Sequence, residues 1–267
     1  NLRVMTIILV VILHTGVTYS GIGGWYYIEN HEVDLFSRIF FAFFQTFTQA
    51  YFMSLLFMVS GYFTRHSLEK KGPGRFLAGR LKRLGIPLLV YIFIVHALAV
   101  KLAYPDLDLA SWYARGIRDL SFLSWTGPLW FVEALLIFTI VYVAVYLAFR
   151  KCRFSLKFRF TLPVVAILIL VITLLAFTLR LVYPIGTDFS NLQFGFFSAY
   201  IVMFITGILA HTSGLFESIS LQEGKRWLLV SLGVGIPAWI LVIYFSGAIE
   251  GDPDHAPHEL LIPFDCA

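Results

Sequence analysis

The chain has 267 residues, of which 59% are hydrophobic and only 13% are charged, and its formal net charge at pH 7 is +4. A soluble core formed by a chain of this length cannot enclose so much apolar surface, so the composition excludes a soluble globular protein and indicates an integral membrane protein. The basic residues lie mainly in the predicted loops, which makes the net charge a signal of membrane topology. It gives no support for nucleic-acid binding.

Seven hydrophobic runs reach the length of about 20 residues that a helix needs to cross a bilayer. The second is long enough to be tilted or kinked near Ser60-Gly61, and Pro87, Pro128 and Pro163 stand near the starts of later runs, where a missing N–H costs little. We therefore expect an all-α, polytopic membrane helix bundle, organised as a single transmembrane domain over residues 1–267. The predicted spans are 4–20, 36–63, 86–104, 128–149, 161–183, 193–211 and 227–247.

The distribution of basic residues predicts the orientation of these spans. Of the 20 lysine and arginine residues, 15 fall on one side of the predicted membrane, chiefly in the loops 64–85 and 150–160, whereas the opposite loops carry mostly acidic residues. By the positive-inside rule, the amino terminus is cytoplasmic and the acidic loops face outward. Cys152 and Cys266 fall on opposite sides, so we expect no disulfide between them, and their spacing does not predict a metal site.

Arg3 and His14 lie eleven residues apart on the first predicted helix. Eleven steps of about 100° bring both side chains to one face, with His14 roughly 16 Å deeper and near the middle of the membrane. Ionisable residues inside a membrane segment usually line a path for a substrate or ion, and a neutral imidazole suits general-base work. The alternatives are a histidine that only hydrogen-bonds a neighbouring helix and an arginine that snorkels to the surface.

Other polar side chains occur in the second and fourth spans. Gln45 and Gln49 share a helix face, so they can orient a polar acceptor or hydrogen-bond another helix. Ser60-Gly61 permits a helix irregularity or the close approach of another helix. Trp130 fits an aromatic-belt anchor, whereas Glu133, one turn deeper, has no such explanation and is a candidate for binding a cation or a hydroxylated acceptor.

The loop from Arg65 to Arg83 holds the largest basic cluster in the chain, and setting the topology is part of its role. The cluster also suits the docking of an anionic cytosolic ligand. Arg80 and Arg83 are three residues apart and so share one helical face, and arginine is suited to bidentate phosphate binding. The phosphates of coenzyme A fit such a site.

Four sequence patterns occur in the order and at the span positions found in acyltransferase family 3, the multi-span enzymes that O-acylate carbohydrates at membranes. The chain therefore resembles that family over roughly its first half. The patterns are Arg-x10-His at Arg3 and His14, Phe-Met-x-x-Leu-Phe-x-x-Ser-Gly-Tyr at 52–62, Arg-Leu-x-Arg-Leu-x-x-Pro at 80–87, and Leu-Trp-Phe at 129–131.

The resemblance implies that acyl-coenzyme A, with acetyl-coenzyme A foremost, is the cytoplasmic co-substrate, with no tightly bound cofactor. The acyl group then passes to a hydroxyl of a carbohydrate or glycolipid at or near the outer face of a bacterial inner membrane. His14 corresponds to the catalytic histidine, while Arg3, Arg80 and Arg83 correspond to donor-binding positions. Family members often have a polar or acidic residue a turn before the histidine, where this chain has Val11. The family has about ten spans, so the seven found here are expected to form a domain that is incomplete at its carboxyl end.

The sequence thus predicts His14 and Glu133 as catalytic residues in a site without metal. The competing hypothesis is a transporter or flippase of a polar lipid or sugar, which repeats with broken helices would favour, and no such repeat is evident. The oligomeric state stays open. The predicted donor-binding residues are Arg3, Arg65, Arg75, Arg80 and Arg83, and the predicted site-shaping residues are Gln45, Gln49, Ser60, Gly61 and Trp130.

Overall fold

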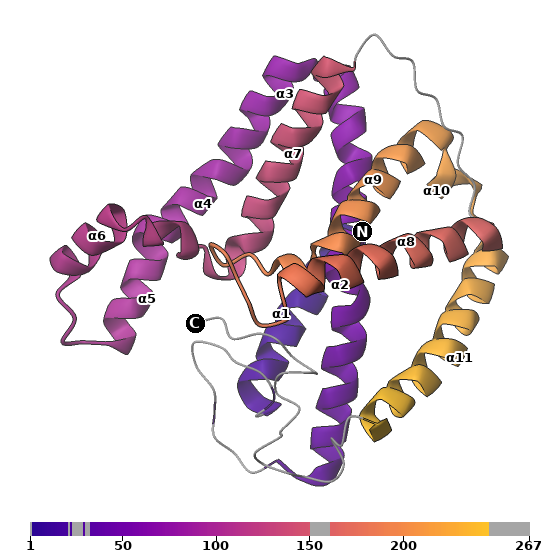
Figure 1. The fold of residues 1–267 in the computed structure, drawn as a ribbon, viewed down its shortest axis with the longest axis horizontal. Coiled ribbons are helices and arrows are strands. Elements are labelled where there is room, and N and C mark those ends of the chain that lie inside the picture. The colour runs from indigo at the N-terminus through magenta and orange to yellow at the C-terminus, as the bar shows by residue number, and fades with distance from the viewer. Residues whose placement is uncertain (1, 21, 23–28, 30–32, 150–160, 246–267) are drawn as a thin grey trace.

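In the computed structural model, residues 2–20, 22, 29, 33–149 and 161–245 are described, and helices account for most of them (Figure 1). The predicted features at 150–160 and beyond residue 245, including Cys152 and Cys266, lie outside the described residues. The helices are α1 (Leu2–Ser20), α2 (Leu35–Lys71), α3 (Pro73–Arg80), η1 (Leu81–Gly85), α4 (Ile86–Val90), η2 (Tyr91–Val95), α5 (His96–Ala103), α6 (Leu109–Arg118), η3 (Ser121–Ser124), η4 (Gly127–Leu129), α7 (Trp130–Ala148), α8 (Leu162–Val182), η5 (Phe194–Phe196), α9 (Phe197–Ser213), α10 (Leu215–Ser218) and α11 (Leu221–Phe245).

Every predicted span coincides with helix. Six helical segments are long and apolar enough to cross a membrane, and α1 contributes a shorter apolar segment, Val4–Ser20. The prediction of an all-α, polytopic membrane bundle is confirmed. The six segments are Leu35–Lys71, Pro73–Ala103, Gly127–Ala148, Leu162–Val182, Phe194–Ser213 and Leu221–Val242.

The region predicted as the loop 64–85 is helical, so that prediction is wrong. α2 continues to Lys71, Gly72 turns the chain with φ of 75°, and Pro73 starts α3 directly afterwards. The basic residues of this region interrupt the hydrophobic pattern but favour helix, and Gly72-Pro73 is the only strong helix-breaking pair before η1. The cluster is therefore held on a rigid helical hairpin.

Pro87 was predicted near the start of a span, but it lies inside a helical stretch that begins at Pro73 and ends at Ala103. Pro87 has no N–H to donate to the preceding turn. The π-helical turn Leu81–Gly85 stands directly before α4, where the pattern of backbone hydrogen bonds must adapt to the missing donor. Pro128 and Pro163 do lie at the starts of η4 and α8, as predicted.

The close approach of α2 to α9 explains Ser60-Gly61. α2 is continuous through these residues, so no interruption occurs there. Instead, a Cβ atom added at Gly61 would overlap the carbonyl oxygen of Phe204 in α9, and one added at Gly207 would overlap that of Met58 in α2. Two facing glycines let the helix backbones touch, which is the usual way that helices pack tightly in lipid.

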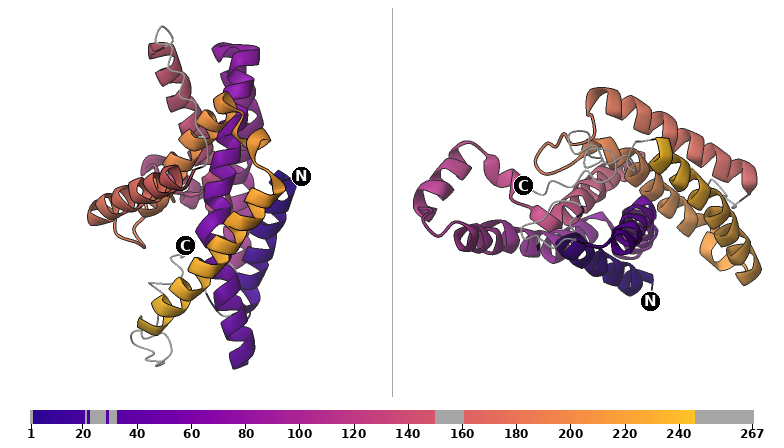
Figure 2. Two further views of the ribbon diagram at one scale, coloured as in Figure 1. Left: turned by 90° about the vertical axis from the view of Figure 1, so that its right-hand side faces the viewer. Right: turned by 90° about the horizontal axis from the view of Figure 1, so that it is seen from below.

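The main core lies between α1, α2, α7 and α9. Phe57 is completely buried and contacts the rings of Phe131 and Tyr200 at centroid distances of 4.8 and 4.9 Å. Leu13 extends this core to α1. Viewed from below, the α3–α6 region and α8 with α11 project to opposite sides of this centre (Figure 2).

α8 and α11 are attached to the core at few points, and no residue in the apolar windows of these two helices is buried. Trp239 of α11 donates a 2.7 Å hydrogen bond from Nε1 to Thr46 Oγ1 and packs edge-on against Phe43 of α2. Arg180 of α8 donates from Nε to the carbonyl oxygen of Gly195 at 3.3 Å. Exposed apolar helices of this kind suit contact with lipid.

Candidate functional site

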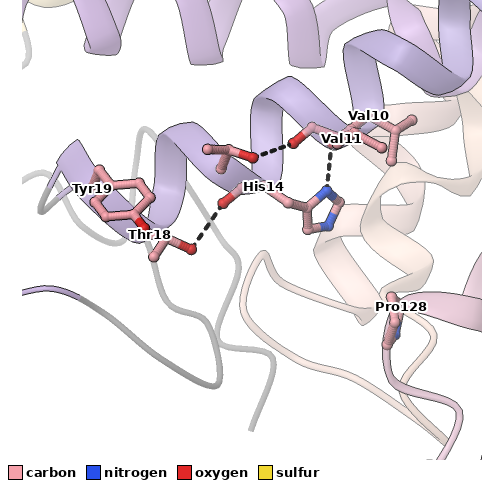
Figure 3. Close-up of a pocket in the computed structure, with 7 residues that line it drawn as sticks. Val10, Val11, His14, Thr18, Tyr19 and Pro128 are labelled. Atoms are coloured by element: carbon pink, nitrogen blue, oxygen red, sulfur yellow. Dashed lines mark hydrogen bonds between the residues drawn. The ribbon is translucent and has the colours of Figure 1, made fainter.

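His14 lies in a cleft of about 460 Å³, the His14 cleft, formed mainly by one face of α1 (Figure 3). The cleft combines aliphatic walls with the hydroxyl groups of threonine and tyrosine, and one residue beside the start of α7 closes it. Polar groups of this kind, placed on a mostly apolar wall, are typical of small-molecule sites. The lining residues are Val10, Val11, His14, Thr15, Thr18, Tyr19 and Pro128.

The backbone of α1 orients the His14 ring. Nδ1 lies 2.7 Å from the carbonyl oxygen of Val10, one turn earlier (Figure 3). A carbonyl oxygen only accepts hydrogen bonds, so Nδ1 carries the hydrogen in this contact and Nε2 is the basic nitrogen of the neutral ring. The Val10 carbonyl therefore orients the imidazole in this chain, which has Val11 at the position where an acidic residue could otherwise do so.

His14 was expected near the middle of the membrane, and it lies two residues past the middle of the apolar segment Val4–Ser20 of α1. It is six residues before Ser20, or about 9 Å from the end of the helix. Pro128, at the start of the α7 segment, shares its cleft. The histidine therefore lies beside the start of the α7 segment.

Gln45 and Gln49 lie near α1, and Gln45 forms the interhelical hydrogen bond that we had considered. Its Nε2 donates to Ser20 Oγ at 2.9 Å, and the side chain is only 2% exposed. The Oε1 atoms of both glutamines are buried and have no hydrogen-bond partner among the described residues. Gln45 thus ties α1 to α2 beside the His14 cleft, and the two glutamines retain two acceptor oxygens.

Glu133 does not join His14, because it is absent from the residues that line the His14 cleft. It lies within hydrogen-bonding reach of Thr126, and its Oε2 is buried with no hydrogen-bond partner among the described residues. Trp130 packs into the core against Tyr200, with ring centroids 5.9 Å apart. The structure therefore places Glu133 and Trp130 at the start of α7, outside the cleft.

Thr126 and Asn191 connect this start of α7 to the chain after α8. Asn191, in the left-handed conformation with φ of 60°, donates from Nδ2 to Thr126 Oγ1 at 3.0 Å and to the carbonyl oxygen of Gly127 at 2.9 Å. Sequence reasoning missed this contact. Ser190-Asn191 is a turn signal, but nothing in the sequence shows which residue such a turn will meet.

The predicted donor-binding residues lie at the other end of the molecule, which we call the basic end: residues 64–85 with the carboxyl ends of α7 and α9. The ends of α2 and α7 meet the start of α3 at the top of Figure 1. Leu68, Phe76 and Val143 join these three helices in a small core of their own. This small core fixes the helix ends that carry the basic side chains of α2 and α3.

The arginines of the basic end differ in their contacts. Arg65 forms an ion pair with Glu69 and donates from Nη1 to the hydroxyl of Tyr142. Arg80 donates from Nη2 to Thr64 Oγ1 at 3.0 Å. Arg75 and Arg83 are exposed. Arg80 and Arg83 thus have unequal surroundings, with Arg80 directly before the π-helical turn and Arg83 within it. The side chain of Arg3 lies outside the described residues.

The two ends are far apart along α2. A Cβ added at Gly16, two residues after His14, would lie 3.6 Å from Gln45 Nε2, so this part of α1 is level with Gln45. Arg65 is twenty residues further along α2, which corresponds to about 30 Å of helix. That length equals the thickness of the hydrocarbon core of a bilayer. His14 and Arg65 therefore lie far apart along α2.

Comparison with known proteins gives one match. A family model of acyltransferase family 3, described as an acyltransferase domain, matches residues 1–264. No curated protein and no solved structure matches the chain. In the described part of the chain, no three side chains of histidine, cysteine, aspartate or glutamate form a group that could hold a metal ion.

Proposed function

The chain belongs to acyltransferase family 3, a family of membrane O-acyltransferases, and from this premise we propose that it moves an acyl group from cytoplasmic acyl-coenzyme A to a hydroxyl of a carbohydrate or glycolipid at the outer face. The protein is an acyltransferase, and its apolar helices make it an integral, multi-pass membrane protein. An acyl donor is implied by the family. Acetyl-coenzyme A as that donor, a single domain over 1–267, and a bacterial inner membrane with the basic end inside are parts of the proposal.

The observation that carries the proposal is the orientation of His14. With the hydrogen on Nδ1 held by Val10, Nε2 is the nitrogen that takes the proton of the acceptor hydroxyl. The hydroxyl oxygen attacks the thioester carbonyl, the carbon–sulfur bond breaks, and the thiolate leaves with the electron pair. The shared cleft with Pro128, which begins the α7 segment on the predicted outer side, supports an acceptor that arrives from that side. Glu133 does not line the cleft, so the proposal assigns this proton transfer to His14 alone.

The basic end supports a donor with phosphate groups on the cytoplasmic side. Arg75 and Arg83 are exposed there, and Arg80 is half-buried beside them. A donor held at this end needs a long arm to bring its thioester toward His14, and the pantetheine arm of coenzyme A is long and flexible. Holding both reactants in place lowers the entropic part of the barrier.

The direct test is acyl transfer by the whole protein in sealed vesicles. We expect that acetyl-coenzyme A labelled in its acetyl group and added on the side of the basic end yields label on a hydroxyl of a carbohydrate acceptor. The measurement is the labelled acceptor separated from the donor. Label that is found only on the donor or in free acetate, whichever acceptor is supplied, would refute the proposed transfer.

The second test concerns the donor. We expect Arg80→Ala together with Arg83→Ala to raise the Kd for acetyl-coenzyme A about tenfold or more, since each charge-assisted bond to a phosphate contributes about 1.5–3 kcal/mol. The measurement is equilibrium binding to purified protein. Arg118→Ala, which removes an exposed arginine at the predicted outer side, is the matched control. An unchanged Kd in the double variant would remove both residues from the donor site.

A further inference from the structure

Glu69 is the only acidic residue between positions 64 and 85, a region with seven basic residues. Its carboxylate contacts an arginine and a histidine from different helices. Oε1 lies 2.6 Å from Arg65 Nε on α2, and Oε2 lies 3.6 Å from His211 Nε2 on α9. Glu69 therefore supplies negative charge at the point where α2 and α9 end together.

The two partners are held in place by other contacts. Arg65 Nη1 donates to the hydroxyl of Tyr142 at 3.3 Å, and its guanidinium lies 6.0 Å from the ring centroid of Tyr146. His211 packs edge-on against Tyr62 at 5.1 Å and against His66 at 5.4 Å. The Nδ1 atom of His211 is buried and has no hydrogen-bond partner among the described residues.

Glu69 itself is the most loosely held member of this group. Its side chain is 44% exposed, against 27% for Arg65 and 20% for His211. An ion pair that is open to solvent to this degree contributes little, typically below about 1 kcal/mol, because water screens it. A ligand with more negative charge can displace such a carboxylate, and a phosphate matches the guanidinium better than a single carboxylate oxygen does.

We propose that Arg65 and His211 form a phosphate subsite for the acyl donor, and that the Glu69 carboxylate competes with the phosphate for them. This inference rests on the proposed function for the identity of the donor, but not for the existence of the anion site. Tyr142 and Tyr146 position Arg65, and Tyr62 positions His211. Donor binding then breaks the Glu69 contact between α2 and α9 and replaces it with contacts to the phosphate.

The test uses Glu69→Gln in the whole purified protein, with adenosine 3′,5′-diphosphate and inorganic pyrophosphate as probes in equilibrium binding. We expect Glu69→Gln to lower the Kd of both probes about twofold to fivefold, the factor for the loss of one competing ion pair. Arg65→Gln should raise both Kd values. The double variant with Arg65→Gln and Glu69→Gln should not show the lower Kd values expected for Glu69→Gln alone. Glu223→Gln, which removes a carboxylate from the start of α11, should leave both values unchanged.

The outcomes separate this inference from the proposed function. If Glu69→Gln tightens pyrophosphate but adenosine 3′,5′-diphosphate binds no better than pyrophosphate, the anion site is real and coenzyme A is not the donor. If Glu69→Gln lowers the melting temperature but leaves both Kd values equal to those of Glu223→Gln, Glu69 only joins α2 to α9 and the inference is wrong. It is also wrong if neither probe binds either protein, whatever the transfer assay gives.

Discussion

Replacement of His14 by alanine is expected to reduce acyl transfer by a factor of about 10² to 10⁴, the range for loss of a positioned general base. The ring is oriented through Nδ1 by the Val10 carbonyl, and its face of α1 opens into the His14 cleft. The measurement is the rate of labelled acetyl transfer at saturating acetyl-coenzyme A. Because the donor arginines are about 30 Å away along α2, the Kd for the donor should stay unchanged.

A chemical and a structural role of His14 are distinguished by rescue. The cleft of about 460 Å³ has room for a free imidazole molecule, so added imidazole should restore part of the activity of His14→Ala. His14→Gln keeps a polar side chain of similar size but has no basic nitrogen, and it should be as inactive as the alanine variant. Normal transfer by His14→Ala at a wild-type level of folded protein would refute the proposed role.

Alanine at Gly207 is expected to cause a larger loss of stability than alanine at the other compared glycines in the described part of the chain. The new Cβ would overlap the Met58 carbonyl oxygen and lie 2.9 Å from the backbone nitrogen of Tyr62. Neither atom belongs to a side chain that can rotate away, so α2 and α9 must separate. Overpacking of a core usually costs about 1–3 kcal/mol, and a backbone clash falls at or above the upper end of that range. The measurement is the melting temperature in detergent.

Gly61→Ala tests the same contact from the other helix, and it should also lower the melting temperature because its Cβ would overlap the Phe204 carbonyl oxygen. Gly233→Ala in α11 is the matched control, since nothing lies within 4 Å of its Cβ. It should be neutral or slightly stabilising, because alanine favours helix over glycine by about 0.5–1 kcal/mol. Melting temperatures that are equal in all three variants would contradict the close packing of α2 and α9.

The number and positions of the membrane helices were readable from the sequence, because a span is a local property. A run of apolar residues that crosses lipid must satisfy its backbone within its own helix, so length and hydrophobicity suffice to identify it. The basic region at 64–85 was misread for the same reason. Its charges interrupt the hydrophobic run, but they do not break the helix, which ends only at Gly72 and resumes at Pro73.

The contacts of single polar residues were partly readable. The spacing of Arg3 and His14 and the i, i+4 pair of glutamines lie on single helices, where 3.6 residues per turn determines which side chains share a face. Glu133 was expected to act with His14, but these residues come from different helices. Which faces of α1 and α7 meet depends on packing around Phe57 and on the chain after α8, where Asn191 bonds Thr126.

The sequence by itself determined that this is a multi-pass α-helical membrane protein of acyltransferase type, with a histidine on its first helix and a basic cluster after its second. Only the tertiary structure decided that Val10 orients His14, that these two regions lie about 30 Å apart, and that Glu69 joins Arg65 to His211. The physical reason is the range of the interactions. Hydrophobicity and helical periodicity act within one segment, whereas the partner of a buried polar group is set by how whole helices pack, here through the facing glycines of α2 and α9.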